Sequence, residues 1–226
     1  MQFLNSTLKR FFVGSLAVIS LTAIAFAGNA SRLILPDPAT DISTSTVKGT
    51  QTAVLSGGCV WGVEAVFERL KGVSDVVSGY SGGSAATAHY DEISSGKTGH
   101  AESVRITYEP KQISYSQLLK VYFSVAHDPT QLNRQGPDRG TQYRSAIFFN
   151  NDEQKQVAQA YIEQLNQAQV FRKPIVTQLV PLNSFYAAED YHQQFLDRNP
   201  NHPYIVVHDL PKLAQLREQF SDMYKK

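Results

Sequence analysis

Residues 51–72 read QTAVLSGGCVWGVEAVFERLKG. The point where the pattern of this stretch changes from that of a strand to that of a helix decides the fold. Its first residues form an apolar run that is typical of a strand. After two glycines, Val63 and Phe67 recur at helical spacing, and Gly72 predicts the end of that helix. The sequence therefore predicts a strand that turns sharply into a helix at residues 57–59.

The only cysteine and the only tryptophan of the chain lie at this corner. Cys59 stands where the first N–H groups and the positive end of the helix dipole favour an anion, so we expect its thiol to ionise more readily than a free thiol. Trp61 lies off the apolar stripe, which leaves its ring free to line a pocket beside the sulfur. Cys59 could equally be a buried structural cysteine. Gly57 and Gly58 favour the first interpretation, because glycine is used where backbone turns sharply or a ligand approaches closely.

The composition is that of an ordinary globular protein. In a chain of 226 residues, 42% are hydrophobic and 18% are charged, which suits one domain with a substantial core. The formal net charge of +1 gives no indication of a nucleic-acid partner. The six histidines form no His-x-x-x-His pair, so no metal site is expected. Without a coiled-coil pattern or an apolar interface stripe, we expect a monomer.

The N-terminus differs from the rest of the chain. The pair Lys9-Arg10 precedes an apolar run over residues 11–27, which ends in the sequence AFA at 25–27, a pattern typical of signal-peptide cleavage. We therefore interpret residues 1–30 as an export signal. An uncleaved membrane anchor is the alternative, because the run approaches the length of a membrane span.

Two further ranges follow from the composition. Residues 31–50 are rich in Ser, Thr and Pro, and we expect a flexible tether there, with the folded domain over residues 51–226. Export would place the protein in the periplasm, outside the cell or in a lumen. A single cysteine in such a compartment cannot form an internal disulfide, which favours a reactive thiol.

The hydrophobic pattern after the first helix completes the order of elements. We expect a strand over 73–80, a polar loop over 84–99, a half-buried strand over 103–108, a helix over 114–126 and a strand over 145–149. Ser114 and Gln117 form a capping box at the start of the second helix. This is the βαββαβ order of an α+β, ferredoxin-like two-layer sandwich. Additional C-terminal elements are expected as a helix after residue 151, a strand over 175–180, a short helix over 189–196 and a final helix over 211–224.

In such a fold, four segments could bring polar side chains together. They are the corner itself, the loop before the third expected strand, the loop over 127–144 and the turn over 186–192. The side chains that they supply are Tyr90, Glu102, His127, Asp128, Asp138, Tyr143 and His192.

Each of these side chains also has a structural explanation. The tyrosines could be half-buried aromatics, the histidines satisfied structural residues, and the aspartates turn formers that hold their own loops. Glu102 opens an alternating strand and could simply be solvated. If it faces the pocket of Cys59 and Trp61, burial raises its pKa toward the value of a general acid.

Six blocks of the chain match one known family. They are GGCVWGVE at 57–64, GYSGG at 79–83, GHAE at 99–102, HDPT at 127–130, GTQYRS at 140–145 and AEDYHQ at 188–193. Together they span most of the expected domain and resemble peptide methionine sulfoxide reductase A, in a form with a single cysteine. This family reverses the oxidation of methionine and acts on the S epimer of the sulfoxide.

The resemblance implies a thiol-dependent reduction of methionine sulfoxide, free or in peptides and proteins, and hence repair of oxidised proteins. Cys59 would attack the sulfoxide sulfur while Glu102 donates a proton to its oxygen, leaving Cys59 as a sulfenic acid. Tyr90 and Tyr143 resemble the hydroxyl donors that hold this oxygen, and Trp61 would cradle the substrate methyl group. Asp138 resembles the pocket carboxylate of the family, and His192 lies in the last matching block, so both are expected to bind substrate.

Two departures from the family pattern matter. Val60 stands where the family usually has Phe, whose ring helps to enclose the substrate methyl group, so we expect a looser wall there. No second cysteine is available to resolve the sulfenic acid, and Ser95 stands where some relatives carry Cys. The expected reductant is therefore an external thiol, such as thioredoxin, glutaredoxin or a small thiol, with no bound cofactor.

Two rival interpretations remain at this point. In a cysteine hydrolase, Cys59 would be the nucleophile and His127 or His192 the base, and an acyl-enzyme would accumulate. In a non-catalytic domain, the same pocket would bind oxidised methionine without releasing methionine. Neither explains why Tyr90 and Glu102 accompany the Cys59 motif.

Overall fold

The computed structural model describes residues 34–44 and 49–225 of the chain. The expected export signal over residues 1–30 lies outside the described residues.

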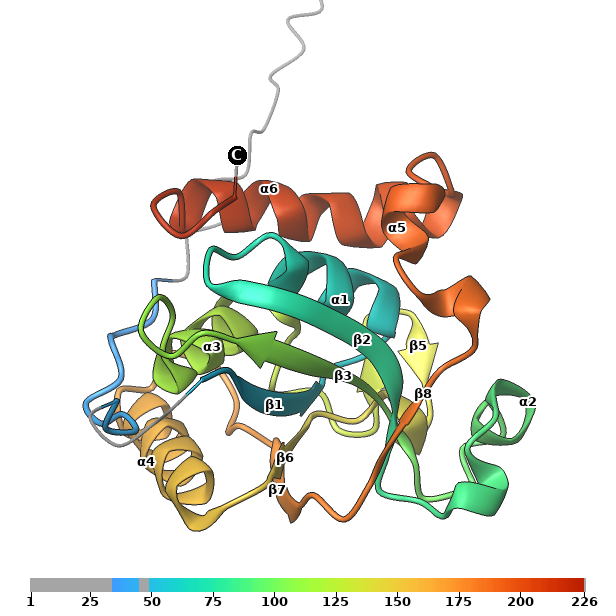
Figure 1. Cartoon of the computed structure of the whole chain (residues 1–226), viewed down its shortest axis with the longest axis horizontal. Coiled ribbons are helices and arrows are strands. Elements are labelled where there is room, and N and C mark those ends of the chain that lie inside the picture. The colour runs from blue at the N-terminus through green and yellow to red at the C-terminus, as the bar shows by residue number, and fades with distance from the viewer. Residues whose placement is uncertain (1–33, 45–48, 226) are drawn as a thin grey trace, which may run out of the picture. The chain divides into compact units, whose positions relative to one another are not determined.

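A curled sheet of six strands forms the centre of the fold, in the order β7-β6-β1-β3-β2-β8 (Figure 1). All neighbouring strands are antiparallel except β6 and β7, which are parallel. In the register of the central strands, Leu55 lies opposite Val104, and Tyr80 lies opposite Glu102. The strands are β1 (Gln51–Ser56), β2 (Val73–Ser81), β3 (Ala101–Tyr108), β6 (Ala146–Phe149), β7 (Gln178–Pro181) and β8 (Phe185–Ala187).

Helices surround this sheet and make the fold a mixed α+β one. Helix α1 packs against β2 and β3, and both α5 and α6 pack against α1. Figure 1 shows α6 on the side of α1 that faces away from the strands. The helices are α1 (Val60–Glu68), α2 (Tyr90–Ile93), α3 (Tyr115–Val121), α4 (Asp152–Gln167), α5 (Phe195–Arg198) and α6 (Leu210–Gln219). The main hydrophobic core contains buried residues of α1, α3, α4, α6 and the central strands.

Several expected elements are present with altered bounds. The capping box of Ser114 and Gln117 is confirmed at the start of α3, but from Tyr122 to Ala126 the helix continues as a π-helical turn. The expected loop over 84–99 contains a 3₁₀ turn and the one-turn helix α2. The helix expected over 189–196 is instead a 3₁₀ turn at Asp190–His192 followed by α5.

Three strands were not expected from the sequence. They are β8 and the hairpin of β4 (Arg134–Gln135) and β5 (Asp138–Arg139). A strand of two or three residues is too short to show a period-two pattern, so its pairing depends on neighbours distant in sequence. The hairpin positions Asp138, one of the candidate side chains.

The segment expected to be a tether differs from that expectation. Leu35 is 2% exposed and belongs to the main core, and the Tyr161 hydroxyl donates a hydrogen bond to the Pro36 carbonyl. Asp41 accepts hydrogen bonds from the backbone and hydroxyl of Ser116, at the start of α3. Residues 34–44 are thus packed on the folded unit. Burial of one leucine and specific hydrogen bonds outweigh a polar composition that suggested flexibility.

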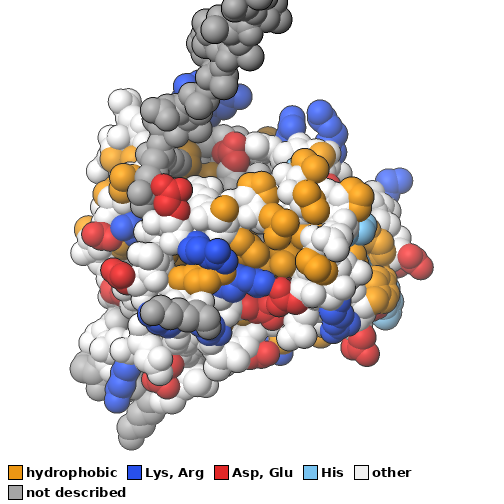
Figure 2. All heavy atoms as spheres, turned by 90° about the horizontal axis from the view of Figure 1, so that it is seen from above, with side chains coloured by type: hydrophobic (Ala, Val, Ile, Leu, Met, Phe, Trp, Pro, Cys, Tyr) orange, Lys and Arg blue, Asp and Glu red, His pale blue; other side chains and the backbone are white. Residues whose placement is uncertain are grey.

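The face that carries α6 has exposed apolar side chains. Figure 2 looks onto this face and shows hydrophobic side chains gathered there with Lys and Arg beside them. The π-helical turn Ile205–Asp209 and α6 contribute Val206, Val207 and Leu210, all of which are exposed. Within the part of the chain that the structure describes, no helix has the length and apolar character needed to cross a membrane.

Candidate functional site

The corner between β1 and α1 places Cys59 at the N-cap of the helix. Gly58 adopts a φ of +95°, which favours glycine, and a Cβ there would lie 2.6 Å from Cγ of Gln135. A Cβ on Gly57 would lie 2.8 Å from Cγ of His127. Both glycines are therefore required by close packing, and the predicted sharp turn is confirmed.

Glu102 lies directly at this corner. Its Oε2 accepts a hydrogen bond of 3.1 Å from the backbone N–H of Val60, the first residue of α1. The side chain is buried, and burial is the main cause that raises the pKa of Glu102 to about 8, with a further contribution from the charge of Asp138. The Val60 N–H opposes this shift. At neutral pH the carboxyl is therefore mainly protonated and can act as an acid.

The thiol of Cys59 does not behave as the sequence suggested. Burial, followed by the negative charges of Glu102 and Asp209, raises the pKa of Cys59 well above its usual value. The N–H of Trp61 and the ammonium of Lys212 act in the expected direction but are outweighed. The expectation of an easily ionised thiol was wrong, because it considered only the helix terminus. In the resting site the thiol keeps its proton.

Trp61 is held in place from several sides. Its ring stacks on Phe195 with a centroid distance of 3.7 Å and an interplanar angle of 11°. Its Nε1 donates a hydrogen bond of 3.1 Å to Nδ1 of His192, and Tyr204 meets the ring edge-on. These contacts fix the indole, which also packs against the main hydrophobic core, although its position off the apolar stripe had suggested that it would line a pocket instead.

His192 and Tyr90 lie together beside Trp61. Their ring centroids are 4.7 Å apart, and burial lowers the pKa of His192. Since Nδ1 of His192 accepts a hydrogen from Trp61, the proton of the neutral ring is on Nε2, which has no partner among the described residues. Glu189 fixes Tyr90 by accepting a hydrogen bond of 2.9 Å from its backbone N–H.

Tyr143 and Asp138 complete the group. Burial raises the pKa of Tyr143, and the charges of Glu102, Asp138 and Cys59 add to the shift, so the phenol faces the same negative groups. Asp138 comes from the β4–β5 hairpin and accepts a hydrogen bond from the hydroxyl of Tyr204. Tyr143 thus lies within the electrostatic influence of Cys59, and Asp138 acts on both Glu102 and Tyr143.

Three candidate side chains are placed elsewhere. Val60 is 3% exposed and belongs to the main hydrophobic core, so only its backbone N–H reaches Glu102. Asp128 accepts hydrogen bonds from Thr130 and Gln131 within its own loop.

His127 is the third of these side chains, and it has a structural role. Both of its ring nitrogens are bonded, Nδ1 to the Tyr122 carbonyl and Nε2 to the Ser145 hydroxyl. Burial lowers the pKa of His127 to about 3, so the ring stays neutral and has no free nitrogen to act as the base of a hydrolase.

Sequence reasoning missed a buried ion pair behind the corner. Asp209 is fully buried, and its Oδ1 accepts a hydrogen bond of 3.1 Å from Nζ of Lys212. A Cβ on Gly62 would lie 2.0 Å from this Oδ1 and 2.9 Å from the Lys212 Nζ, so the pair lies against the first turn of α1. The Asp-x-x-Lys spacing at the start of α6 was the one signal for it.

Glu64 was also missed, although it lies in a quoted motif. It is 1% exposed, and burial raises the pKa of Glu64 to about 8. Its Oε2 accepts a hydrogen bond of 2.8 Å from the N–H of Gln194, the residue before Phe195. Because Phe195 stacks on Trp61, Glu64 helps to position the indole. No group of three or more His, Cys, Asp or Glu side chains that could hold a metal ion is found within residues 34–44 and 49–225.

Comparisons with known sequences agree with this geometry. The family whose sequence model matches is described as peptide methionine sulfoxide reductase, over residues 51–224. The peptide methionine sulfoxide reductase MsrA 2 of Synechocystis sp. is 58% identical over 194 residues, which cover 85% of this chain and 91% of that protein. The MsrA 2 of Mesorhizobium japonicum is 58% identical over 176 residues, covering 78% of this chain and 90% of that protein.

Solved structures give the same result. The reduced form of Mxr1 from Saccharomyces cerevisiae superposes with a TM-score of 0.61 at 32% identity, covering 72% of this chain and 94% of that one. Methionine sulfoxide reductase A of Corynebacterium diphtheriae has a TM-score of 0.59 at 36% identity, covering 74% of this chain and 84% of that one. The range matched in sequence includes all the site residues described above.

Proposed function

The chain belongs to the peptide methionine sulfoxide reductase family. From this premise we propose that Cys59 accepts the oxygen of the sulfoxide, while Glu102 donates a proton to that oxygen and then takes the proton of the thiol. As a member of this family the protein is an oxidoreductase that reduces methionine sulfoxide to methionine and so repairs oxidised proteins at the expense of thiols.

The first step moves one oxygen atom from the substrate to the enzyme. The Cys59 sulfur attacks the sulfoxide sulfur, Glu102 protonates the sulfoxide oxygen, and the carboxylate then recovers the thiol proton. The attack forms an S–S bond between enzyme and substrate. The hydroxyl group then passes from the substrate sulfur to the Cys59 sulfur, so that the S–S bond and the S–O bond of the substrate both break as an S–O bond forms on Cys59. The products are methionine, whose sulfur is reduced by two electrons, and a Cys59 sulfenic acid, whose sulfur is oxidised by two.

The contact of Glu102 with the Val60 N–H is the observation that carries this assignment. It holds a carboxyl group with a pKa raised to about 8 at the same helix terminus as the nucleophile. A buried acid that keeps its proton at neutral pH can donate it to the sulfoxide oxygen. Once it has done so, the resulting carboxylate is a base for the adjacent thiol, whose own pKa is raised.

The remaining polar groups would orient the substrate. The hydroxyls of Tyr90 and Tyr143 are donors suited to the sulfoxide oxygen, and their raised pKa values keep them protonated. The fixed Trp61 ring offers an apolar surface for the substrate methyl group, supported by His192. Asp138, bonded to Tyr204, accepts hydrogen bonds at the rim. We assign the S epimer as substrate, as the sequence resemblance implies.

An external thiol would restore the enzyme, since the chain contains one cysteine. The thiol attacks the Cys59 sulfenic acid, which releases water and forms a mixed disulfide. A second thiol attacks this disulfide, releasing the oxidised reductant and the Cys59 thiol. Thioredoxin, glutaredoxin and small thiols all supply this chemistry.

A single-turnover experiment tests the scheme. The protein is mixed with each epimer of a methionine sulfoxide peptide without any thiol, and a carbon nucleophile is added to trap the sulfenic acid. We expect one equivalent of methionine from the S epimer and one trapped adduct at Cys59, and none from Cys59→Ser. Repeated turnover without thiol, or preference for the R epimer, would contradict the assignment.

The ferredoxin-like description of the fold and the export of the protein are also proposals. The central order β6-β1-β3-β2 is compatible with a ferredoxin-like core extended by β7 and β8. Export is proposed from the charged pair and apolar run within residues 1–30, and a monomer because the sequence has neither a coiled-coil pattern nor an apolar interface stripe. N-terminal sequencing of the mature protein and sedimentation analysis test these two points.

A further inference from the structure

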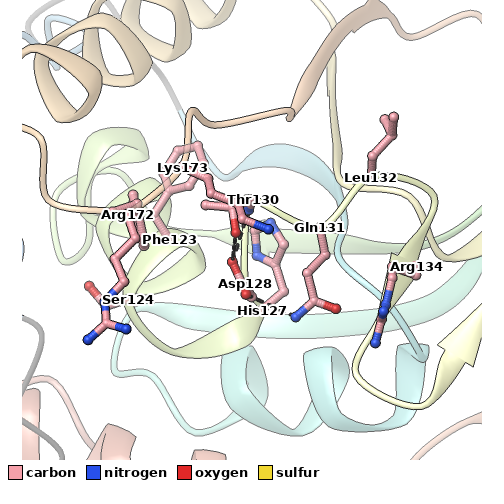
Figure 3. A pocket seen from close by; sticks show the side chains of 11 residues that line it. Phe123, Ser124, His127, Asp128, Thr130, Gln131, Leu132, Arg134, Arg172 and Lys173 are labelled. Carbon is pink, nitrogen blue, oxygen red and sulfur yellow. Dashed lines mark hydrogen bonds between the residues drawn. The ribbon is translucent and has the colours of Figure 1, made fainter.

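A groove of about 790 Å³ opens on the surface of the protein (Figure 3). Its apolar lining comes from Phe123, Leu132 and Phe171, and its charged lining from Asp128, Arg134, Arg172 and Lys173. Neither Cys59 nor Glu102 lines it, so it is distinct from the site assigned above. The volume falls within the usual range for ligand sites in proteins, about 300–1,000 Å³.

The charge of the groove is positive. Arg134, Arg172 and Lys173 have no carboxylate within ion-pair distance among the residues that the structure describes. Arg134 donates one hydrogen bond to the Gly136 carbonyl, so its guanidinium keeps free donors. Asp128 is the one carboxylate in the lining, and its oxygens already accept hydrogen bonds from its own loop. Arg134, Arg172 and Lys173 are therefore available to form ion pairs with an anionic partner.

The positions of these cations favour an extended partner over a small anion. In Figure 3, Arg172 and Arg134 lie at opposite ends of the row of lining side chains, with Thr130 and Asp128 between them. A single phosphate or carboxylate cannot contact both ends, whereas a stretch of polypeptide with several acidic side chains can. The exposed Leu132 and the half-buried Phe171 suit the apolar parts of such a stretch.

Gln135 and the β4–β5 hairpin connect the groove with the Cys59 corner. Gln135 exchanges two hydrogen bonds of 3.1 Å with the backbone of Asp128, and its side chain packs against Gly58. The β4–β5 hairpin carries Arg134 of the groove on one strand and Asp138 of the site on the other. The groove and the site assigned above are thus connected through one hairpin and one packed side chain.

We propose that this groove binds an acidic stretch of the oxidised protein substrate, so that the enzyme favours methionine sulfoxides with Asp or Glu a few positions away. The proposal rests on the function assigned above. The N-terminal residues 1–33 of the chain carry Lys9, Arg10 and Arg32 and no carboxylate, so their charge does not complement the groove.

Peptides with one sulfoxide test the proposal. One series carries three Asp or Glu residues between two and six positions from the sulfoxide, and the matched series carries Asn or Gln. With a small thiol as reductant, we expect the KM of the acidic series to be about fivefold lower at low salt, a difference that disappears at high salt. The double variant Arg172→Glu/Lys173→Glu should reverse the preference, and Lys111→Glu, an exposed control, should keep it.

Free methionine sulfoxide separates this proposal from the assigned function. Its reduction should be the same in the wild type and in the double variant, which also shows that the variant is folded. If free methionine sulfoxide is not reduced at all, the assigned function fails. If it is reduced but the two peptide series have equal KM values, the acidic docking site is overturned. It is likewise overturned if the double variant alters only the KM for thioredoxin.

Discussion

Oε2 of Glu102 and the backbone nitrogen of Val60 are 3.1 Å apart, so one carboxyl group both caps helix α1 and faces the thiol of Cys59. Cys59 and Glu102 therefore cannot be ionised independently. The negative charge of Glu102 raises the pKa of the Cys59 thiol, and burial makes this effect stronger than it would be in water.

Glu102→Gln tests two roles of Glu102 separately: donation of a proton to the substrate, and the charge that raises the pKa of the Cys59 thiol. The amide keeps the size of the side chain and can still accept from the Val60 N–H, but it donates no proton to the sulfoxide oxygen. We expect kcat/KM to fall on the order of 10²- to 10⁴-fold. Iodoacetamide should nevertheless alkylate Cys59 faster at pH 8, because the variant lacks the charge that raises the pKa of the thiol.

The exposed Glu153→Gln on α4 is the matched control and should change neither rate. If Glu102→Gln keeps wild-type activity, Glu102 is not the proton donor. If alkylation slows instead, the charge of Glu102 does not raise the pKa of the Cys59 thiol.

Lys212→Met tests whether the Lys212 ammonium lowers the pKa of the Cys59 thiol. The ammonium lowers the pKa of Cys59, so its removal should raise that pKa and slow alkylation at pH 8, by up to about tenfold for a shift of one unit. The variant also leaves Asp209 buried without its partner, which should lower the free energy of unfolding.

The double variant Asp209→Asn/Lys212→Met removes both charges and should recover part of that stability. Lys111→Met, on the exposed turn after β3, serves as the control. Equal alkylation rates in Lys212→Met and the wild type across the pH range would show that this lysine does not act on the thiol.

Stability should depend on pH through Glu64, whose folded pKa is raised to about 8 by burial. An unfolded glutamate has a pKa of about 4.3, so between these values the folded state holds a proton that the unfolded state releases. The free energy of unfolding should therefore fall as pH rises through this window, with a slope of up to about 1.4 kcal/mol per unit from this group.

Glu64→Gln should reduce this slope, since the amide does not titrate, while Glu102, whose pKa is also raised to about 8, keeps its own contribution. Urea titrations at several pH values between 5 and 8 measure the slope in the wild type, in this variant and in Glu153→Gln. The last should match the wild type, because Glu153 is exposed. An unchanged slope in Glu64→Gln would mean that Glu64 is ionised in the folded protein.

Local patterns predicted the parts of the protein that local physics determines. The Gly-Gly corner, the capping box of Ser114 and the central strands follow from glycine geometry, capping and periodicity, and all are present. The pKa of Cys59 could not be predicted in this way. It depends on Glu102 and Asp209, which the fold brings to the corner from distant positions in the chain.

The C-terminal segment shows the same limit. Its sequence predicted only an amphipathic helix, because the apolar spacing says nothing about what the helix covers. In the structure this segment supplies Tyr204 to Asp138, and Asp209 and Lys212 to the first turn of α1. Likewise, a polar composition suggested a tether, yet Leu35 fills a place in the core. Such contacts depend on tertiary packing alone.

The position of Asp209 and Lys212 late in the chain has a consequence for protein synthesis. Cys59 leaves the ribosome early, but the ion pair against Gly62 and the hydroxyl bonded to Asp138 are among the last parts to be translated. A nascent chain therefore carries its nucleophile long before the surroundings of that nucleophile exist. The reductase becomes competent only when translation is nearly complete, and a messenger truncated before codon 204 would encode a thiol without its finished site.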